Sequence, residues 1–384
     1  MGALKFPSHF RVDSGDFLGV AGEQDSLKSA YLIQAMDKLG YDVVTLGERE
    51  FNFGQDFLLS NFKKTKIDLV SSNLVYADTK KPFVKPYVIK KMCGMRVAFF
   101  GLIGADLKIR TLANERALEI KDPVATAKGL VPELHKKADI VVLLSHIGLT
   151  EGQRLTLDVP GIDVMAFGHQ PGLFREIAKT NGVINTRAGE RGQYIPGVHL
   201  VIDDGKIASY DGEVVSLDDK VPADDEMNRS VDAFNEEMNR RFASVASNQP
   251  PAQPASAPLA GDHYLGEKNC RRCHEAEYQM YSGQQHAQAF QTLVKNQRDS
   301  SPECLPCHVV GYGQPGGFAS KQTTPDLVNV QCENCHGMGT KHPDQGKAVN
   351  AVVGPDVCLT CHTHEQNPNF DYDEALTHIV HWHQ

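Results

Sequence analysis

The sequence predicts a layered α/β domain followed by a smaller, mostly helical and irregular domain that is rich in cysteine and histidine. Strand-like and helix-like patterns alternate up to about residue 246, as is typical of layered α/β domains. Residues 247–260 then form a linker rich in proline and alanine. Eight of the nine cysteines lie beyond this linker. We therefore expect one domain at 1–246 and a second at 261–384.

Short β-rich runs and amphipathic segments define the elements of the first domain. The run DSLKSAYLIQAMDKLG predicts a helix that Asp25 caps and Gly40 ends. The stretch YVIKKMCGMRVAFFGLIG predicts a hairpin that turns near Gly94. The other expected elements, in chain order, are the strands HFRV, YDVVTLG and DLVSSNL, the helix DPVATAKGLVPELHKKA, the strands DIVVLLSHIG and DVMAFGHQ, the meander YIPGVHLVIDDGKIASYDGEVVSL and the helix DDEMNRSVDAFNEEMNRRFASVA.

Composition excludes two classes of partner. The formal net charge is −9, and no block of lysine and arginine interrupts it, so we expect no nucleic-acid surface. Apolar runs stay well short of the roughly 20 residues that a membrane helix needs, so we expect no membrane span.

The second domain contains CRRCH, CLPCH, CENCH and CLTCH. Cys-x-x-Cys-His is the attachment signature of c-type haem, because the two thiols add to the porphyrin and the adjacent histidine can reach the iron. Zinc sites and disulfides do not require a histidine after every second cysteine. The predicted attachment residues are Cys270, Cys273, Cys304, Cys307, Cys332, Cys335, Cys358 and Cys361, and the predicted proximal iron ligands are His274, His308, His336 and His362.

Four haems would leave roughly 30 residues of chain for each haem, too few to wrap each one separately. The haems must then pack together, supply much of the core and form a path for electrons. Each iron also needs a distal ligand or an open position, which decides between electron transfer and catalysis. Seven further histidines suffice for bis-histidine ligation, with Met280 and Met338 as alternatives: His263, His286, His342, His364, His378, His381 and His383.

The amino-acid sequence of this region resembles that of tetrahaem cytochromes of the cytochrome c-554 type. The resemblance rests on CRRCHEAEYQMYSGQQHAQAF, CENCHGMGTKH and CLTCHTHEQNPNFDYDEALTHIVH and covers about 262–384. It implies that His286 and His342 are distal ligands and that His381 matches the terminal position best, ahead of His378 and His383. His263 and His364 are then candidates for the fourth distal position. The family also includes a five-coordinate haem, and Tyr281 stands near where its members usually have tryptophan.

Haem attachment bears on location and assembly. Because c-type haem is attached outside the bacterial cytoplasmic membrane, we expect a periplasmic or extracellular protein. The N-terminal residues lack a secretory signal, so we expect that Met1 is not the true start. The histidine-rich ending HIVHWHQ either supplies a ligand within the chain or donates one to a neighbouring subunit in a homo-oligomer or filament.

Four loops of the first domain, DSGDFLG, LGEREF, LLSHIGL and AFGHQP, each follow a predicted strand. In this order they resemble the GD, GNHE, SH and GHxH blocks of calcineurin-like metallophosphoesterases of the 5′-nucleotidase branch. SSNLVYAD and INTRAGERGQYIPGVHL fit the same branch. The resemblance implies a metal site at Asp16, Glu48, His146 and His169, with Glu48 in place of the usual asparagine.

This chain departs from the family's two-metal pattern. Arg49 replaces the catalytic histidine, Pro171 replaces a ligand histidine, and the opening Asp-x-His block is absent. Arginine stays protonated and cannot act as a general acid or base near neutral pH. We expect at most one divalent ion at this site. The alternative is that Arg49 pairs with Asp16 or Glu48 in place of a metal.

The sequence thus predicts electron transfer through four c-type haems to redox partner proteins or extracellular acceptors. It favours an electron-transfer protein over an enzyme. Two alternatives stay open, namely a multihaem reductase with one open iron and a metal-dependent phosphoesterase.

Overall fold

The computed structural model describes residues 8–20, 22–218, 220–248, 263–341, 353–363, 366–367 and 369–379. The chain divides into two compact units, Met1–Met227 and Asn228–Gln384. The boundary falls inside helix α5 (Asp225–Asn248), so most of this helix belongs to the second unit. The sequence pattern instead places it at the end of the first domain. Among the described residues, no helix is both long enough and apolar enough to cross a membrane.

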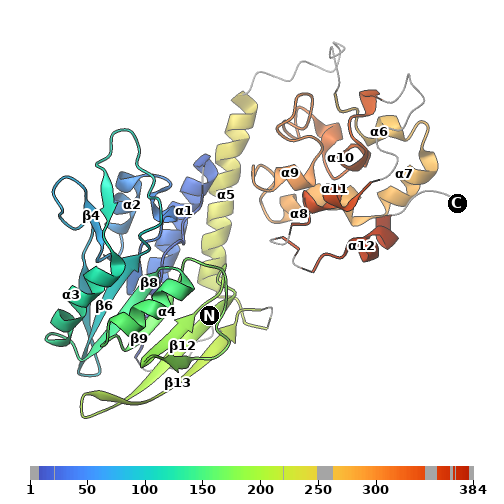
Figure 1. The fold of residues 1–384 in the computed structure, drawn as a ribbon. Helices are drawn as coiled ribbons and strands as arrows, with labels where there is room; N and C mark the ends of the chain where they lie inside the picture. Colours follow the sequence, from blue (N-terminus) through green and yellow to red (C-terminus); the bar gives the residue numbers. More distant parts are fainter. Residues whose placement is uncertain are drawn as a thin grey trace. The chain divides into compact units, whose positions relative to one another are not determined.

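The first unit contains two main sheets (Figure 1). The smaller sheet is parallel, with the order β1-β2-β3. The larger has the order β10-β11-β9-β8-β6-β5, and β11, β9, β8 and β6 run parallel. The strands are β1 (Val12–Asp13), β2 (Val43–Thr45), β3 (Asp68–Val70), β5 (Tyr87–Met92), β6 (Met95–Ile103), β8 (Ile140–His146), β9 (Val164–Phe167), β10 (Ala178–Thr180) and β11 (Val183–Arg187).

Two antiparallel pairs and several helices complete this unit. The pairs are β4 (Leu74–Tyr76) with β7 (Leu118–Ile120), and β12 (Tyr194–Asp203) with β13 (Lys206–Ser216). The helices are α1 (Gly22–Lys38), the 3-10 turn η1 (Arg49–Phe51), α2 (Gln55–Phe62), α3 (Pro123–His135) and α4 (Leu149–Asp158).

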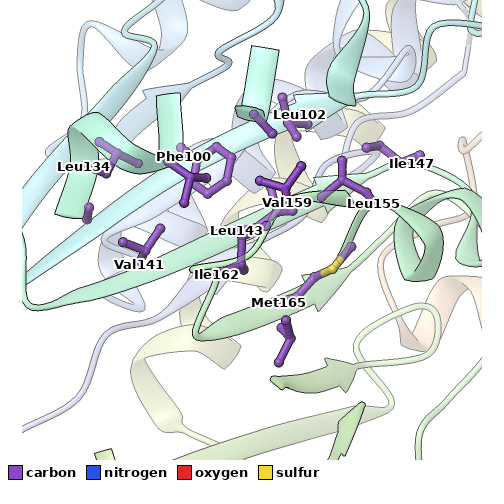
Figure 2. Close-up of a cluster of buried hydrophobic side chains, with 14 of the residues drawn as sticks. Phe100, Leu102, Leu134, Val141, Leu143, Ile147, Leu155, Val159, Ile162 and Met165 are labelled. Atoms are coloured by element: carbon purple, nitrogen blue, oxygen red, sulfur yellow. The ribbon is translucent and has the colours of Figure 1, made fainter. Parts of the chain in front are cut away.

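Strand β6 shows how the layers form, because successive side chains of a strand point to opposite faces. Phe100 and Leu102 are fully buried against helices α3 and α4, in a cluster that includes Leu134 (Figure 2). Phe99, on the other face, packs in a cluster with Val43 of the smaller sheet. Another cluster joins the smaller sheet to α1 and α2. The order helix, sheet, sheet, helix confirms the layered α/β sandwich that the sequence predicts.

Two local predictions of this unit have different outcomes. Gly40 ends α1 with φ of 74°, but Asp25 lies inside the helix and accepts a hydrogen bond from the backbone N–H of Val20 (3.0 Å). The expected N-cap is therefore wrong, since the helix begins three residues earlier. The hairpin of β5 and β6 turns at Cys93 and Gly94, both with positive φ (49° and 80°), as predicted.

The second unit consists of short helices joined by irregular segments. After α5 these are α6 (Glu267–Cys270), α7 (Glu275–Ser282), η2 (Gln285–Gln288), α8 (Ala289–Lys295), α9 (Leu305–His308), η3 (Pro325–Leu327), α10 (Cys332–His336), η4 (Gly339–Lys341), α11 (Pro355–Leu359) and α12 (Tyr372–Ile379). Its described residues form one small hydrophobic cluster, made of Phe290, Leu293, Leu305, Val309, Val310, Phe318 and Leu327.

Candidate functional site

Side chains from four strand ends meet in the first unit. Asp16 follows β1 and Glu48 follows β2, both in the smaller sheet. His146 ends β8 and His169 follows β9, both in the larger sheet. Because parallel strands bring their carboxyl ends to one edge, loops distant in sequence converge there. The structure therefore brings together all four residues that the sequence proposes as ligands.

One ligand atom from each of these residues lies within 4.8 Å of the others. Nε2 of His146 is 3.2 Å from Glu48 Oε2 and 3.6 Å from Asp16 Oδ2. Nδ1 of His169 is 3.8 Å from Glu48 Oε2, and it is a buried ring nitrogen without a hydrogen-bond partner among the described residues. Two imidazoles and two carboxylates thus face a common point.

The backbone around this point is built for close approach. Asp16 and His169 both have positive φ (65° and 67°), a conformation that costs about 1–3 kcal/mol in residues other than glycine and clusters at functional sites. A side chain at Gly47 would collide with the Asp16 carboxylate and the His146 ring. Glycine at position 47 therefore leaves room between the ligand residues.

His146 is oriented and strongly polarised by its surroundings. Its Nδ1 lies 2.7 Å from the backbone oxygen of Ser14, which directs Nε2 toward the carboxylates. Burial lowers the pKa of this histidine, but hydrogen bonds to Asp16 and Glu48 outweigh burial and raise the pKa to about 10. The same bonds lower the pKa of Glu48, and they help to lower that of Asp16 against its burial. The cluster is thus an electronegative position that favours a cation.

Glu50 is a structural carboxylate that the sequence does not single out, although it lies in the same LGEREF loop. It is fully buried, and its two oxygens accept hydrogen bonds from the backbone N–H groups of Asp16, Phe17, Leu18 and Gly47 at 2.6–3.3 Å. Burial and the Asp16 charge raise the pKa of Glu50 to about 7, against the effect of these hydrogen bonds. Glu50 therefore ties the two acidic loops together.

Arg187 is a second residue that the sequence does not single out. Its side chain is buried at the end of β11, and its guanidinium donates to the backbone oxygens of Gln170 and Pro171 (2.7 Å to Pro171). Burial lowers its pKa. Arg187 thus holds the loop that carries His169. In the sequence, the one feature that could have drawn attention to Arg187 is its position as a charged residue at the end of a β-rich run.

Arg49 lies at the rim of the cluster. Its backbone N–H donates to Asp16 Oδ1 (3.0 Å), and its Nε lies 3.7 Å from Asp16 Oδ2. About half of the side chain is exposed (52%). Arg49 therefore pairs with Asp16, one of the two pairings that the sequence suggests, while the four ligand residues still converge.

The donor set fits a divalent metal ion. Two carboxylate oxygens and two imidazole nitrogens suit Mn²⁺, Fe²⁺ or Zn²⁺. Pro171 offers no side-chain donor. Among the described residues, no second group of three or more such ligands lies beside this one. The geometry accordingly suits one ion.

In the second unit the cysteine pairs lie on or beside short helices. The thiol of Cys270 hydrogen-bonds to that of Cys332, which raises the pKa of Cys332 and lowers that of Cys270. Cys307 similarly neighbours Cys361, although burial contributes most to raising the pKa of Cys307 to about 12. The first motif therefore lies beside the third, and the second beside the fourth.

Two of the predicted proximal histidines make contacts through Nδ1. Nδ1 of His308 is 2.7 Å from the backbone oxygen of Ala289. Nδ1 of His362 is 3.2 Å from the amide of Asn367, and its ring stacks on Phe370 with centroids 4.5 Å apart. For His308, an Nδ1–H that donates to a carbonyl oxygen leaves the lone pair of Nε2 for a metal, which is the arrangement usual for ligating histidines.

His286 lies beside His362, one of the predicted proximal histidines. Its ring centroid is 6.2 Å from that of His362, although 75 residues separate them in sequence. Burial, followed by the neighbouring His362, lowers the pKa of His286, so the ring favours the neutral form that binds metals. Of the other distal candidates, His263 and His378 lie within the described residues. His342, His364, His381 and His383 lie outside the described residues.

The two halves of the chain match different known proteins. Residues 269–337, which contain three of the four Cys-x-x-Cys-His motifs, match the family "Cytochrome c554 and c-prime". Cytochrome c-554 of Nitrosomonas europaea is 34% identical over 97 residues, which cover 21% of this chain and 41% of that protein. The C-terminal region is therefore a domain of the cytochrome c554 type, and it implies haem c and redox partners.

The N-terminal half is similar to phosphoesterases. A 2′,3′-cyclic-nucleotide 2′-phosphodiesterase/3′-nucleotidase of Haemophilus influenzae is 35% identical over 187 residues, covering 43% of this chain and 28% of that protein. The corresponding protein of Salmonella typhimurium is 30% identical over 227 residues, which cover 50% of this chain and 35% of that protein. The chain thus spans about a third of the length of these curated relatives.

Solved structures show the same fold. A 5′-nucleotidase precursor from Thermus thermophilus superposes with a TM-score of 0.53 and 22% identity, covering 63% of this chain and 51% of that one. SoxB, a sulfate thiohydrolase of Thermus thermophilus, superposes with a TM-score of 0.54 and 19% identity, covering 59% of this chain and 42% of that one. The chain therefore joins an N-terminal domain of the calcineurin-like metallophosphoesterase type to a C-terminal cytochrome c554 domain.

Proposed function

We propose that the chain is an exported electron-transfer protein that carries four c-type haems, most of them bound by two histidines. The proposed attachment cysteines and proximal histidines are those of the four motifs. We assign electron transfer to the domain at residues 261–384. The linker at 247–260 joins this domain to a metal-binding domain at 1–246. Its partners are redox proteins or extracellular acceptors, its location is periplasmic or extracellular, and its ending HIVHWHQ supplies a ligand either within the chain or to a neighbouring subunit of a homo-oligomer.

The observation that carries this proposal is the pair formed by His286 and His362. Two imidazoles on opposite sides of one metal, each with a metal–nitrogen bond of about 2 Å, have centroids roughly 6 Å apart. The observed 6.2 Å matches that separation. His286 then fills the distal position of the haem attached at Cys358 and Cys361.

The protein's own residues support this role in three ways. Haem c supplies a one-electron couple whose potential depends on its axial ligands and burial. His286 would close one iron to exogenous ligands, Asn367 and Phe370 contact His362, and the carbonyl oxygen of Ala289 orients His308. The small hydrophobic cluster of this unit is consistent with a core that the haems complete.

Spectroscopy of a variant tests this assignment. His286→Ala should convert one haem of the four to a high-spin form that binds carbon monoxide when reduced. Gln285→Ala, at the exposed neighbouring position, should leave the spectrum as in the wild type. A His286→Ala protein whose haems stay low-spin would remove His286 from the ligand set. Carbon monoxide binding by the wild type would instead favour the reductase alternative.

A second candidate function is metal-dependent phosphoester hydrolysis by the N-terminal domain. The convergence of Asp16, Glu48, His146 and His169 within 4.8 Å favours a metal centre there. Arg49, which cannot transfer a proton near neutral pH, weighs against hydrolysis. Release of phosphate from nucleotides that depends on added Mn²⁺ and is lost in His146→Ala would support this function. No release at any metal concentration would exclude it.

A further inference from the structure

The third Cys-x-x-Cys-His motif differs from the other three in the side chain that follows its first cysteine. In chain order this position holds Arg271, Leu305, Glu333 and Leu359. Arg271 is an exposed cation that pairs with Glu275 (2.7 Å), whereas Glu333 is only 4% exposed. The third motif therefore carries a buried acidic side chain between its two cysteines.

We propose that the ionised carboxylate of Glu333 lowers the midpoint potential of the haem attached at Cys332 and Cys335. This inference rests on the proposed attachment of haem c at the third motif. Glu333 acts on a one-electron couple between Fe(III) and Fe(II), in which a redox partner supplies or accepts the electron and no bond forms or breaks. It acts through its charge and is not a ligand.

Both oxygens of Glu333 accept hydrogen bonds from backbone N–H groups. Oε1 accepts from Gly339 (2.6 Å), and Oε2 accepts from Gly266 (2.8 Å). The N–H of Leu265 lies 3.0 Å from each oxygen. Each of these partners is a donor, which suits a carboxylate that accepts at both oxygens and not a carboxylic acid that must donate its proton. The fold therefore holds Glu333 in its charged form.

The charge of Glu333 is poorly screened. The carboxylate is buried, so little water surrounds it. Its contacts among the described residues are backbone N–H groups, which stabilise the charge but carry no net charge of their own. Because Glu333 lies between the two attachment cysteines, haem bound there lies within reach of this charge. A negative charge near the iron opposes the addition of an electron and so lowers the midpoint potential.

The hydrogen bonds of Glu333 also fix its position. Leu265 and Gly266 lead into α6, which ends at Cys270 of the first motif, and Gly339 begins η4 just after the third motif. The carboxylate therefore joins the chain before the first motif to the chain after the third, and it cannot turn toward solvent without breaking these contacts.

The neighbours of Glu333 hold the same helix from both ends. Gln331, the N-cap of α10, accepts a hydrogen bond from the N–H of Glu267 in α6 (2.7 Å). Asn334 donates to the backbone oxygen of Val309, directly after the second motif (3.0 Å). Side chains of this one segment thus contact the chain beside two other motifs, so the charge of Glu333 has a fixed place in the unit.

Redox titration of the full haem-loaded chain tests this inference. Glu333→Gln removes the charge and keeps the size of the side chain. We expect the ratio of Fe(II) to Fe(III) in one haem to rise about 10-fold at a fixed potential, which raises its midpoint potential by about 59 mV. Glu333→Asp keeps the charge and should change the ratio by about 3-fold or less. This contrast separates the charge from the hydrogen bonds, because both substitutions disturb the bonds.

The matched control is Glu303→Gln, which removes an exposed carboxylate directly before the first cysteine of the second motif. Water screens this charge, so the ratio should change by about 2-fold or less. Equal midpoint potentials in Glu333→Gln and the wild type would overturn the inference, as would equal shifts in Glu333→Gln and Glu333→Asp.

Two further outcomes concern haem attachment at the third motif, which mass spectrometry of its peptide measures. Loss of haem from this motif in Glu333→Gln would overturn the inference, because Glu333 would then act in folding and not on the potential. Absence of haem at Cys332 and Cys335 in the wild type would be a different result, because it would overturn the proposed attachment first.

Discussion

The two units of this chain differ in what completes them. The first unit buries large hydrophobic clusters on both faces of its larger sheet, and its candidate site consists of its own side chains. The described part of the second unit has one small cluster and four cysteine motifs. A domain with its own hydrophobic core can fold before it binds a ligand, whereas a domain with little core needs its cofactor in order to fold. Haem attachment should therefore contribute more to the stability of the second unit than metal binding contributes to that of the first.

The largest expected effect comes from a double substitution that should destabilise the second unit and leave the first unit folded. Cys304→Ala combined with Cys307→Ala should remove one of the four proposed haems and expose this unit to proteases, because that haem would no longer anchor it. Haem quantification and limited proteolysis measure these changes. The matched control is Cys93→Ala, at an exposed cysteine outside the motifs, which should alter neither. Full haem content in the double variant would contradict attachment at this motif.

A core substitution should break the first unit alone. Phe100 is fully buried between β6 and helices α3 and α4, so Phe100→Ala should destabilise this unit by about 3–5 kcal/mol. Hydrogen exchange measured by mass spectrometry should show faster exchange in residues 8–218 with an unchanged haem spectrum. Leu157→Ala, at a side chain that is 68% exposed, should cost about 0.5 kcal/mol or less. A changed haem spectrum in Phe100→Ala would mean that the two units are coupled.

A substitution beneath the metal site should sharpen the comparison without unfolding either unit. Glu50→Gln replaces an acceptor of four backbone N–H groups by an amide whose NH₂ cannot accept them. Loosening the two acidic loops should weaken Mn²⁺ binding by about 10–100-fold, as calorimetry would show. Glu133→Gln, at an exposed position of α3, serves as the control. Unchanged Mn²⁺ affinity would show that Glu50 does not position the ligands.

The smallest expected effect concerns a single haem. Asn367→Ala removes the amide that contacts Nδ1 of His362, so the midpoint potential of one haem should shift by an amount equivalent to about 1 kcal/mol or less. Redox titration should detect the shift while the haem stays low-spin. Gln366→Ala, at the exposed neighbour, should leave the potential unchanged. A high-spin haem in Asn367→Ala would mean that this amide is needed for ligation itself.

Prediction from the sequence succeeded where the deciding interactions are local. The hairpin at Cys93 and Gly94 was predictable because glycine tolerates positive φ in a tight turn, and Gly40 ended its helix for the same reason. Asp25 shows the limit of such reasoning. Its carboxylate accepts a hydrogen bond from the N–H of Val20 while Asp25 itself lies inside the helix. Aspartate is a common N-cap residue, but here it does not occupy the N-cap position.

The sequence by itself determined the chemistry available to this protein. Cys-x-x-Cys-His predicts where haem is attached, because both thiols and the histidine belong to one pentapeptide. The family pattern likewise identified Asp16, Glu48, His146 and His169 before their positions were known. Only the tertiary structure decided which groups meet. His146 and Glu48 meet although they are 98 positions apart, and His286 and His362 meet although they are 76 positions apart, because parallel strands and packed helices bring distant segments together. No local pattern encodes such contacts, since they arise only when the whole core has formed.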